Sequence, residues 1–199
     1  MNRTGIISAG IVFGLSMILG SFNVTSAHAT KIFDASSKKW IEYGPGMRFG
    51  GKSPVKRKVV EYDGPYKANT IIIDTEERRL YYVMPDGKAL KYGVGVGREG
   101  FQWAGSNRIS RKAEWPGWTP PPAMRKRQPG LPAYMEGGIN NPLGARALYI
   151  GSTIYRIHGS NEPWTIGQAV SSGCIRMTNE DVQHLYDRVK VGTRVVVKR

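Results

Sequence analysis

Residues 154–177 read IYRIHGSNEPWTIGQAVSSGCIRM and contain the only cysteine of the chain, Cys174. A thiol becomes a good nucleophile when a nearby base or positive charge favours the thiolate. His158 ends a strand-like run, Gly159 after it permits a sharp exit, and Gly173 allows a tight turn that aims backbone N–H groups at a reacting carbonyl oxygen. The stretch therefore holds the parts of a Cys–His acyl-transfer site. Cys174 follows His158 by sixteen positions, and this spacing does not by itself bring the two into contact.

Short β-branched or alternating runs lie at the start of this stretch and on both sides of it, and they predict strands. Their residue ranges are 55–62, 70–74, 79–84, 89–96, 108–114, 147–150, 154–158 and 193–198. Turn residues at 85–88 join two of these runs into a hairpin. Short strands with frequent turn signals are typical of an all-β sandwich or barrel, so we expect a mainly β fold.

One helix is expected just after the cysteine. Thr178 is a good N-cap residue, and Asp181 three positions later completes a pattern that resembles a capping box. Apolar residues then recur at helical spacing, at Val182, Leu185, Tyr186 and Val189. Gly192 stands where the helix is expected to stop. His184 falls within it, where we expect an exposed side chain.

Residues 115–142 differ in composition from the rest of the chain, because they hold seven of its twelve prolines and show little periodicity. A loop of this length in a compact domain is usually functional or disordered, and large apolar residues argue against disorder. Those residues are Trp115, Trp118, Met124 and Tyr134. We expect an ordered, Pro-rich lid or wall beside a site. The alternative is a packing arm that closes the sandwich.

The N-terminus has the pattern of a secretory signal peptide. Arg3 gives a positive start, an apolar run follows at 6–22, and Ala27-His28-Ala29 resembles a signal peptidase site. We expect 1–29 to be removed, which leaves no membrane span, and 30–64 to form an N-terminal arm. The alternative is an uncleaved anchor, although about 17 apolar residues are marginal for crossing a bilayer. The sequence predicts export, to the periplasm or cell envelope.

Cysteine count and net charge limit the possible partners. Oxidising compartments favour paired cysteines, so a lone one in an exported chain is an intermolecular link, a reactive thiol or a small buried hydrophobe. The formal net charge of +14 suggests an anionic partner, such as a cell-wall polymer or phospholipid headgroups. The basic residues form no recognition helix or aromatic platform, so nucleic acid is not expected.

Two histidines after residue 29 and one cysteine fit no usual metal-ligand spacing. We expect neither a metal nor a cofactor.

The pair His158-Gly159, followed by Ser-x-Gly-Cys-Ile-Arg-Met at 171–177, resembles the signature of the L,D-transpeptidase catalytic domain (YkuD-type). The similarity extends to the family's opening hairpins at 70–100 and to its approach to the histidine strand at 141–149. The resemblance implies a YkuD-like β-sandwich at 65–199, with a short helix after the catalytic cysteine.

The resemblance also implies roles for individual residues. Cys174 attacks the carbonyl between the third residue and the terminal D-Ala of a peptidoglycan stem tetrapeptide, and His158 takes the thiol proton. The Gly159 carbonyl orients the histidine, and the backbone N–H groups of Gly173 and Cys174 form the oxyanion hole. D-Ala leaves, and an acceptor amine resolves the thioester. With a diaminopimelate side chain as acceptor, the product is a 3→3 cross-link.

The substrate contacts are less defined by the motif. Ser172 stands where the commonest form has a histidine distinct from the base. Arg176 is a candidate carboxylate clamp, because a guanidinium can bind a carboxylate through two hydrogen bonds; the alternative is an ion pair with Glu180 or Asp181. The further substrate-binding candidates are Ser171, Ser172, Tyr155 and Trp164, with core packing as the alternative for the two aromatic residues. Arg156 shares a strand face with His158, where a cation would disfavour imidazolium, unless it is a solvated surface charge.

Related activities and one non-enzymatic reading stay open at this point. The same acyl-enzyme would tether envelope proteins to peptidoglycan if a protein amine resolved it. With water as acceptor it would act as an L,D-carboxypeptidase or endopeptidase. A non-catalytic wall-binding protein would have an unreactive Cys174.

Overall fold

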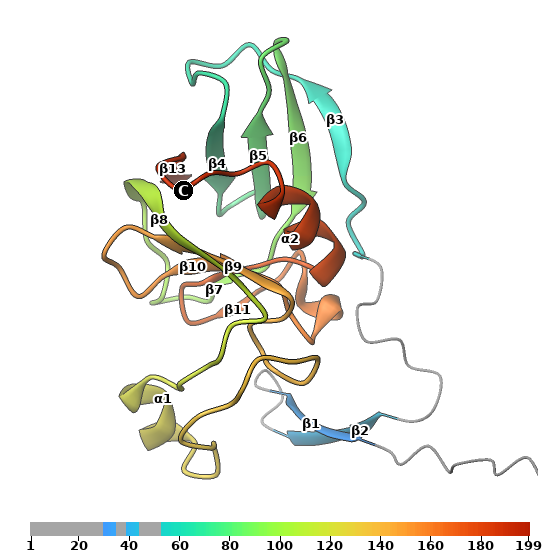
Figure 1. The fold of residues 1–199 in the computed structure, drawn as a ribbon, viewed down its shortest axis with the longest axis vertical. Coiled ribbons are helices and arrows are strands. Elements are labelled where there is room, and N and C mark those ends of the chain that lie inside the picture. Colours follow the sequence, from blue (N-terminus) through green and yellow to red (C-terminus); the bar gives the residue numbers. More distant parts are fainter. Residues whose placement is uncertain (1–29, 35–38, 44–52) are drawn as a thin grey trace, which may run out of the picture.

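The computed structural model describes residues 30–34, 39–43 and 53–199 (Figure 1). The predicted signal peptide at 1–29 lies outside the described residues, as does part of the predicted N-terminal arm. The chain forms thirteen described strands, two short α-helices and one 3-10 helix. The strands are β1 (Thr30–Asp34), β2 (Lys39–Tyr43), β3 (Lys58–Glu61), β4 (Thr70–Asp74), β5 (Arg79–Val83), β6 (Lys88–Gly93), β7 (Val96–Gly97), β8 (Gly105–Glu114), β9 (Arg146–Ile150), β10 (Arg156–His158), β11 (Ala169–Ser171), β12 (Ile175–Arg176) and β13 (Arg194–Lys198). The helices are α1 (Pro122–Arg127), η1 (Pro163–Thr165) and α2 (Asn179–Tyr186).

Nine strands form one mixed sheet in the order β12-β10-β9-β8-β13-β4-β5-β6-β3. The pairs β10–β12 and β13–β4 are parallel, and the other neighbours are antiparallel. Separate two-stranded sheets join β7 to β11 and β1 to β2. Figure 1 shows β4, β5 and β6 above β9 and β10, with α2 beside them. The predicted mainly β fold is confirmed.

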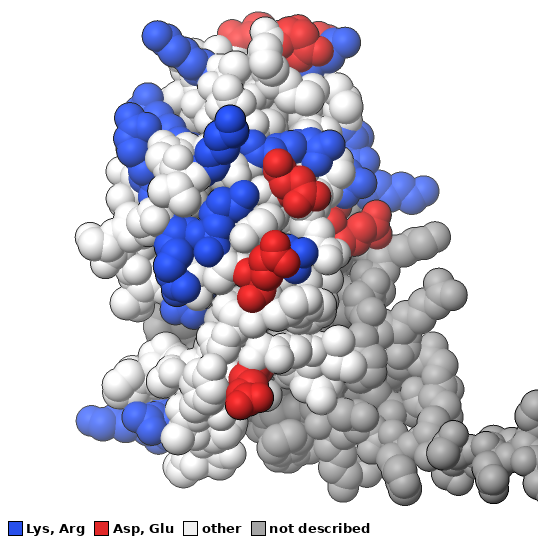
Figure 2. Space-filling model, viewed as in Figure 1, with Lys and Arg blue, Asp and Glu red and all other residues white. Residues whose placement is uncertain are grey.

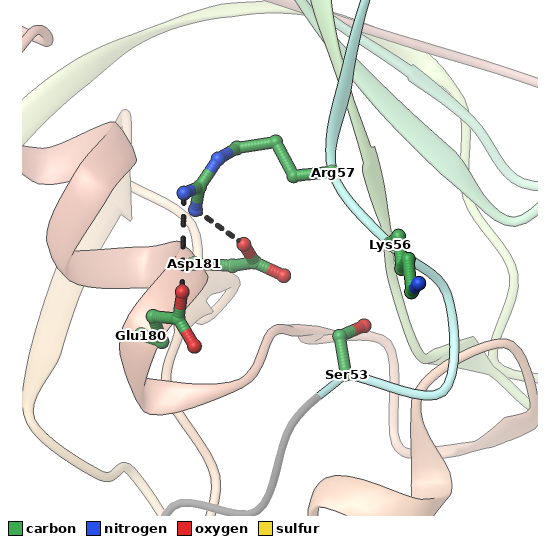
Figure 3. Close-up of a pocket in the computed structure, with 5 residues that line it drawn as sticks. All are labelled: Ser53, Lys56, Arg57, Glu180 and Asp181. Carbon is green, nitrogen blue, oxygen red and sulfur yellow. Dashed lines mark hydrogen bonds and ion pairs between the residues drawn. The ribbon is translucent and has the colours of Figure 1, made fainter.

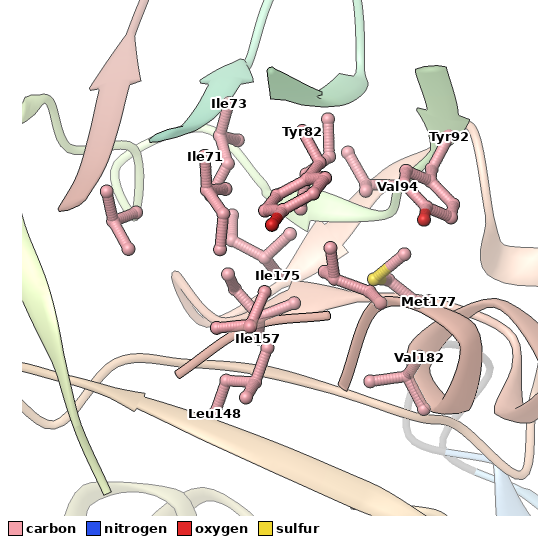
Figure 4. Packing of buried hydrophobic residues seen from close by; sticks show 14 of the residues in the cluster. Ile71, Ile73, Tyr82, Tyr92, Val94, Leu148, Ile157, Ile175, Met177 and Val182 are labelled. Carbon is pink, nitrogen blue, oxygen red and sulfur yellow. The ribbon is translucent and has the colours of Figure 1, made fainter. Parts of the chain in front are cut away.

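The core lies between the two halves of this bent sheet (Figure 4). Ile71 and Ile73 on β4 face Leu148 on β9 and Ile157 on β10 across it, and all four side chains are fully buried. Burying one such side chain contributes about 1.5–3 kcal/mol relative to leaving it exposed. The two layers of the sandwich are therefore halves of one hydrogen-bonded sheet.

Several predicted elements differ from the structure in their bounds. The run predicted at 89–96 divides into β6 and β7, because Gly95 forms an isolated bridge with Arg176 and Val96 then pairs with β11. The strands β11 and β12 have only three and two residues and were not predicted. They are too short to show a period in the sequence.

The helices also differ from the prediction. α2 begins as expected, because the Thr178 hydroxyl accepts a hydrogen bond from the Asp181 N–H at 3.1 Å. It ends at Tyr186, well before Gly192, and Nζ of Lys112 donates to the Tyr186 carbonyl oxygen at 2.7 Å. The helix predicted just after the cysteine is confirmed by α2. The helix α1 in the Pro-rich segment was not predicted; it begins at Pro122, and proline at the first helical position costs no hydrogen bond.

His184 is not exposed as expected. Its ring is half-buried beside Tyr92, whose hydroxyl lies 2.8 Å from Nδ1 of His184. Figure 2 shows basic side chains gathered over β8 and β9 with fewer acidic ones among them, as the net charge of +14 leads one to expect.

Candidate active site

The register of two parallel strands brings the predicted nucleophile and base to one face of the sheet. β10 pairs with β12 through Ile157 and Ile175, and both isoleucines are buried in the core. Successive side chains of a strand point to opposite faces. His158 directly follows one isoleucine and Cys174 directly precedes the other, so both project to the face turned away from the core.

Cys174 and His158 line one cavity of about 280 Å³ on that face. The other lining residues from the motif region are Ile154, Tyr155, Arg156, Ser171, Ser172 and Arg176. The Pro-rich segment contributes Trp118, Pro121, Pro122, Met124 and Pro142, followed by Leu143. The segment at 115–142 thus lies as a wall beside the two residues, as one of the two sequence interpretations expected.

Gly173 gives the cysteine turn a conformation that other residues rarely adopt. Its φ is +103°, and a Cβ atom there would lie 2.4 Å from the ring of Tyr155. Trp103 stacks on Tyr155 with a centroid distance of 4.6 Å, and its Nε1–H donates to the Gly173 carbonyl oxygen at 2.9 Å. Trp103 thereby positions the turn before Cys174. Its role was not predicted, because no spacing links it to the motif.

The Ser171 hydroxyl closes the same turn from inside. Its Oγ donates to the Cys174 carbonyl oxygen at 2.6 Å and accepts a hydrogen bond from the Gly173 N–H at 3.1 Å. The Gly173 N–H, expected in the oxyanion hole, is therefore engaged within the turn. No described residue accepts a hydrogen bond from the Cys174 N–H. Ser171 thus closes the turn and also lines the cavity. Ser172 lines the cavity as well, with Nη1 of Arg98 3.5 Å from its Oγ.

His158 is buried, and its tautomer follows from its backbone partner. Nδ1 lies 2.5 Å from the Gly159 carbonyl oxygen. A carbonyl oxygen only accepts, so Nδ1 carries the hydrogen and Nε2 keeps its lone pair. Burial, and then the charges of Arg176 and Arg156, lower the pKa of His158 to about 3 against the opposing effect of the Gly159 carbonyl. The imidazole is therefore neutral at pH 7 and available as a base.

Gly159 is also required by packing. A Cβ atom at this position would lie 2.3 Å from Oδ1 of Asn179, the first residue of α2. That oxygen accepts a hydrogen bond from the Ala145 N–H at 2.8 Å. The start of α2 therefore lies directly against the turn that orients His158.

Cys174 is half-buried, with Sγ 4.0 Å from the Ile154 carbonyl oxygen. Burial raises the pKa of the Cys174 thiol, while Arg156 and Arg176 act in the opposite direction. The thiol and the imidazole therefore both rest in their neutral forms at pH 7.

The partner of Arg176 is neither of the acids expected from the sequence. Its Nη1 lies 2.7 Å from Oε2 of Glu162, and the two side chains are only 13% and 4% exposed. Glu180 and Asp181 instead face Arg57 across a separate cavity, with nitrogen–oxygen distances of 3.9 and 2.7 Å (Figure 3). The alternative interpretation from the sequence, an ion pair of Arg176 with Glu180 or Asp181, is therefore wrong.

Trp164 does not reach the cavity. It lies on η1 with 38% of its surface exposed and is not among the residues that line the cavity around Cys174. From the sequence we expected either a substrate contact in this cavity or core packing. The position of Trp164 fits neither expectation. Tyr155 does line the cavity and stacks on Trp103.

The YkuD family model, described as an L,D-transpeptidase catalytic domain, matches residues 68–197. The chain belongs to this family. The resemblance carried by the motif is thereby confirmed. Among curated relatives, the chain is 42% identical over 171 residues to a Probable L,D-transpeptidase ErfK/SrfK of Escherichia coli, with coverage of 79% of this chain and 54% of the relative.

Solved structures give the same fold for this YkuD-family domain. A structure from Brucella melitensis is 44% identical with a TM-score of 0.51, and covers 75% of this chain and 98% of its own. Its name, probable carnitine operon oxidoreductase, gives a different activity that the family model does not share. The catalytic domain of an Enterococcus faecium L,D-transpeptidase acylated by ertapenem has a TM-score of 0.52 at 22% identity, covers 68% of this chain and 100% of its own, and supports the fold alone.

The chain spans about half the length of the curated Escherichia coli relatives that it matches. Within residues 30–34, 39–43 and 53–199, no helix is long and apolar enough to cross a membrane. The same residues contain no group of three or more His, Cys, Asp or Glu side chains placed to hold a metal ion.

Proposed function

We propose that this protein is a peptidoglycan L,D-transpeptidase that forms 3→3 cross-links through a thioester on Cys174, with release of D-Ala. The observation that carries the proposal is the pair of neutral groups in one cavity. Cys174 and His158 both line it, and the Gly159 carbonyl leaves Nε2 of His158 as the basic nitrogen. This is the chemistry of a nucleophile with a neighbouring base.

In the acylation step, Sγ of Cys174 leaves the Ile154 carbonyl and attacks the carbonyl carbon between the third residue and D-Ala. Nε2 of His158 takes the thiol proton. The oxyanion is placed against the Cys174 N–H, and the Gly173 N–H joins it on release from Ser171. The C–N bond then breaks, and the imidazolium returns its proton to the amine of D-Ala.

In the transfer step, the side-chain amine of a diaminopimelate attacks the thioester carbonyl, and His158 takes a proton from that amine. The C–S bond breaks and Cys174 regains its proton from His158. The new amide joins two third-position residues. The expected donor and acceptor are both stem peptides, and the predicted signal peptide at 1–29 would deliver the enzyme to the cell envelope where they occur.

Intact-protein mass spectrometry with a carbapenem tests the nucleophile. A carbapenem mimics the acyl donor, and the Enterococcus faecium domain of the same fold carries an ertapenem adduct. We expect a mass increase of one drug molecule on the folded protein and none on Cys174→Ala of equal thermal stability. A folded wild-type protein without an adduct would argue for the non-catalytic wall-binding alternative.

Product analysis tests the acceptor. Incubation with purified tetrapeptide fragments, followed by mass spectrometry, should give a 3→3 cross-linked dimer and free D-Ala. A tripeptide as sole product would identify an L,D-carboxypeptidase. Stem peptide linked to an added envelope protein would identify a tethering enzyme. Both alternatives keep Cys174 and replace only the acceptor.

A further inference from the structure

Arg156 lies in a row of side chains that crosses three strands beside Cys174. Tyr149 on β9 pairs with Arg156 on β10 on one side and with Arg111 on β8 on the other. The guanidinium carbon of Arg111 is 3.6 Å, and that of Arg156 5.5 Å, from the centroid of the Tyr149 ring. A guanidinium over an aromatic ring keeps its charge while losing freedom of movement. The row therefore holds a cation in a defined place.

The register places this cation next to the nucleophile. Ile157 pairs with Ile175, so Arg156 and Cys174, each one position earlier, are neighbours across two parallel strands. Neighbouring strands lie about 4.8 Å apart. Arg156 also lines the cavity that contains Cys174 and His158.

The two arginines of the cavity differ in how their charges are balanced. Arg176 is paired with buried Glu162 at 2.7 Å. Arg156 forms no ion pair with any residue in the described part of the chain. Its Nη2 donates to the Ile154 carbonyl oxygen at 3.3 Å, and its buried Nε has no hydrogen-bond partner among the described residues. An acidic ligand at Arg156 would therefore meet a guanidinium with no carboxylate to displace among the described residues, whereas at Arg176 it would compete with Glu162.

We infer that Arg156, and not Arg176, receives the C-terminal carboxylate of the donor peptide. The inference rests on the proposed function and names a contact within it. The carboxylate of the departing D-Ala lies one residue beyond the carbonyl that Cys174 attacks, and consecutive Cα atoms are about 3.8 Å apart. A guanidinium on the strand next to the nucleophile is within that reach. Arg111 and Tyr149 act as positioning residues that hold it there.

The test compares two donors that differ only at the C-terminus, a tetrapeptide acid and its C-terminal amide. We expect the wild-type protein to prefer the acid in kcat/KM by roughly 10- to 100-fold, the range of a hydrogen bond to a charged group. In Arg156→Gln the ratio should fall to near one. The ratio is used because a change in thiol reactivity at this position affects both donors equally.

Three variants serve as controls. Arg176→Lys keeps the charge beside Glu162 but removes the planar fork, and the ratio should stay as in the wild type. Arg188→Gln removes an exposed arginine after α2 and should also leave it unchanged. Arg156→Lys should recover part of the preference. A ratio that persists in Arg156→Gln, or that is lost in Arg176→Lys, would overturn the inference.

Calorimetry can measure how the acid and the amide peptide bind to Cys174→Ala. Together with turnover by the wild-type protein, it distinguishes a failure of the Arg156 contact from a failure of the proposed reaction. Preferred binding of the acid that needs Arg156, without turnover by the wild-type protein, would support the contact and refute the proposed reaction. Turnover of both donors at equal efficiency would support the reaction and refute the contact. Binding of neither peptide would refute both.

Discussion

Two groups of buried ionisable side chains lie at opposite ends of the short segment from Cys174 to Asp181, and they balance charge differently. At one end Arg57 pairs with Asp181 and joins the segment before β3 to α2 (Figure 3). At the other end Cys174 and His158 share their cavity with Arg156, which has no acidic partner among the described residues.

Burial is the largest cause of the pKa shift in both groups. It raises the pKa of Asp181 and of Cys174 and lowers the pKa of His158, so each group is driven toward its neutral form. The difference lies in the cations. Arg57 is paired with Asp181 on α2, whereas Arg156, beside Cys174, has no acidic partner among the described residues and is the arginine that we infer binds a ligand. The cavity around Cys174 also contains a paired arginine, Arg176 with Glu162, so Arg156 is the residue that distinguishes this site from the ion pair at α2.

The largest expected effect is on catalysis, from a change at His158. His158→Gln keeps a polar side chain but removes the proposed base, and general base catalysis typically contributes about 10²–10⁴-fold in rate. We expect carbapenem acylation to slow by that factor, as measured by mass spectrometry over time. Wild-type rates in a folded variant would mean that the base lies elsewhere.

The pH dependence of acylation comes next. A pKa of about 3 keeps His158 neutral throughout the range from pH 7.5 to 5, so the acylation rate should change little. A histidine with an ordinary pKa of about 6.5 would lose the basic form and slow the reaction roughly 30-fold at pH 5. The rate should fall only as the pH approaches the folded-state pKa. A drop centred near pH 6.5 would contradict the assigned environment of His158.

The same shift predicts a loss of stability in acid. His158 stays neutral in the folded state but is protonated below pH 6.5 in the unfolded state, so the free energy of unfolding falls as the pH falls through this window. Between pH 6.5 and 5 the loss is roughly 2 kcal/mol. Urea unfolding of His158→Gln should show a smaller loss than the wild-type protein. Contributions from His184 are common to both and cancel.

The smallest expected effect concerns the ion pair at α2. Arg57→Gln leaves the buried Asp181 carboxylate without its cation and should lower the free energy of unfolding by about 1–2 kcal/mol, a value reduced for the partial exposure of Arg57. Adding Asp181→Asn should restore most of this loss, because the unpaired charge is gone. Acylation should stay within about twofold of wild type in both variants. A large loss of acylation would show that the two groups are coupled.

The sequence predicted the parts of the site that lie within a short motif. Cys174, His158 and Gly159 lie together as the resemblance implied, and β4 has its predicted bounds because a run of buried isoleucines leaves little choice of structure. Their catalytic roles stay predictions until the variants are measured.

The partners of charged side chains could not be predicted. Arg176 has acids at 180 and 181 close in sequence, but its side chain projects from the face of β12 that meets Glu162. Trp103 supports the cysteine turn from about seventy positions away. Such contacts depend on the strand order, which no local pattern encodes. The prediction that Trp164 lines the cavity failed because its position in the motif region does not determine where its side chain points from the 3-10 helix η1.

The carbonyl that holds His158 belongs to the main chain, so no substitution of a side chain can delete it. In a triad that ends in an aspartate, one codon change removes the third member. Here a substitution of Gly159 keeps the carbonyl but adds a side chain, whose Cβ atom would lie 2.3 Å from Oδ1 of Asn179. Genetic variation at this position should therefore appear first as a folding defect, because the main-chain carbonyl that holds His158 is present whatever the side chain.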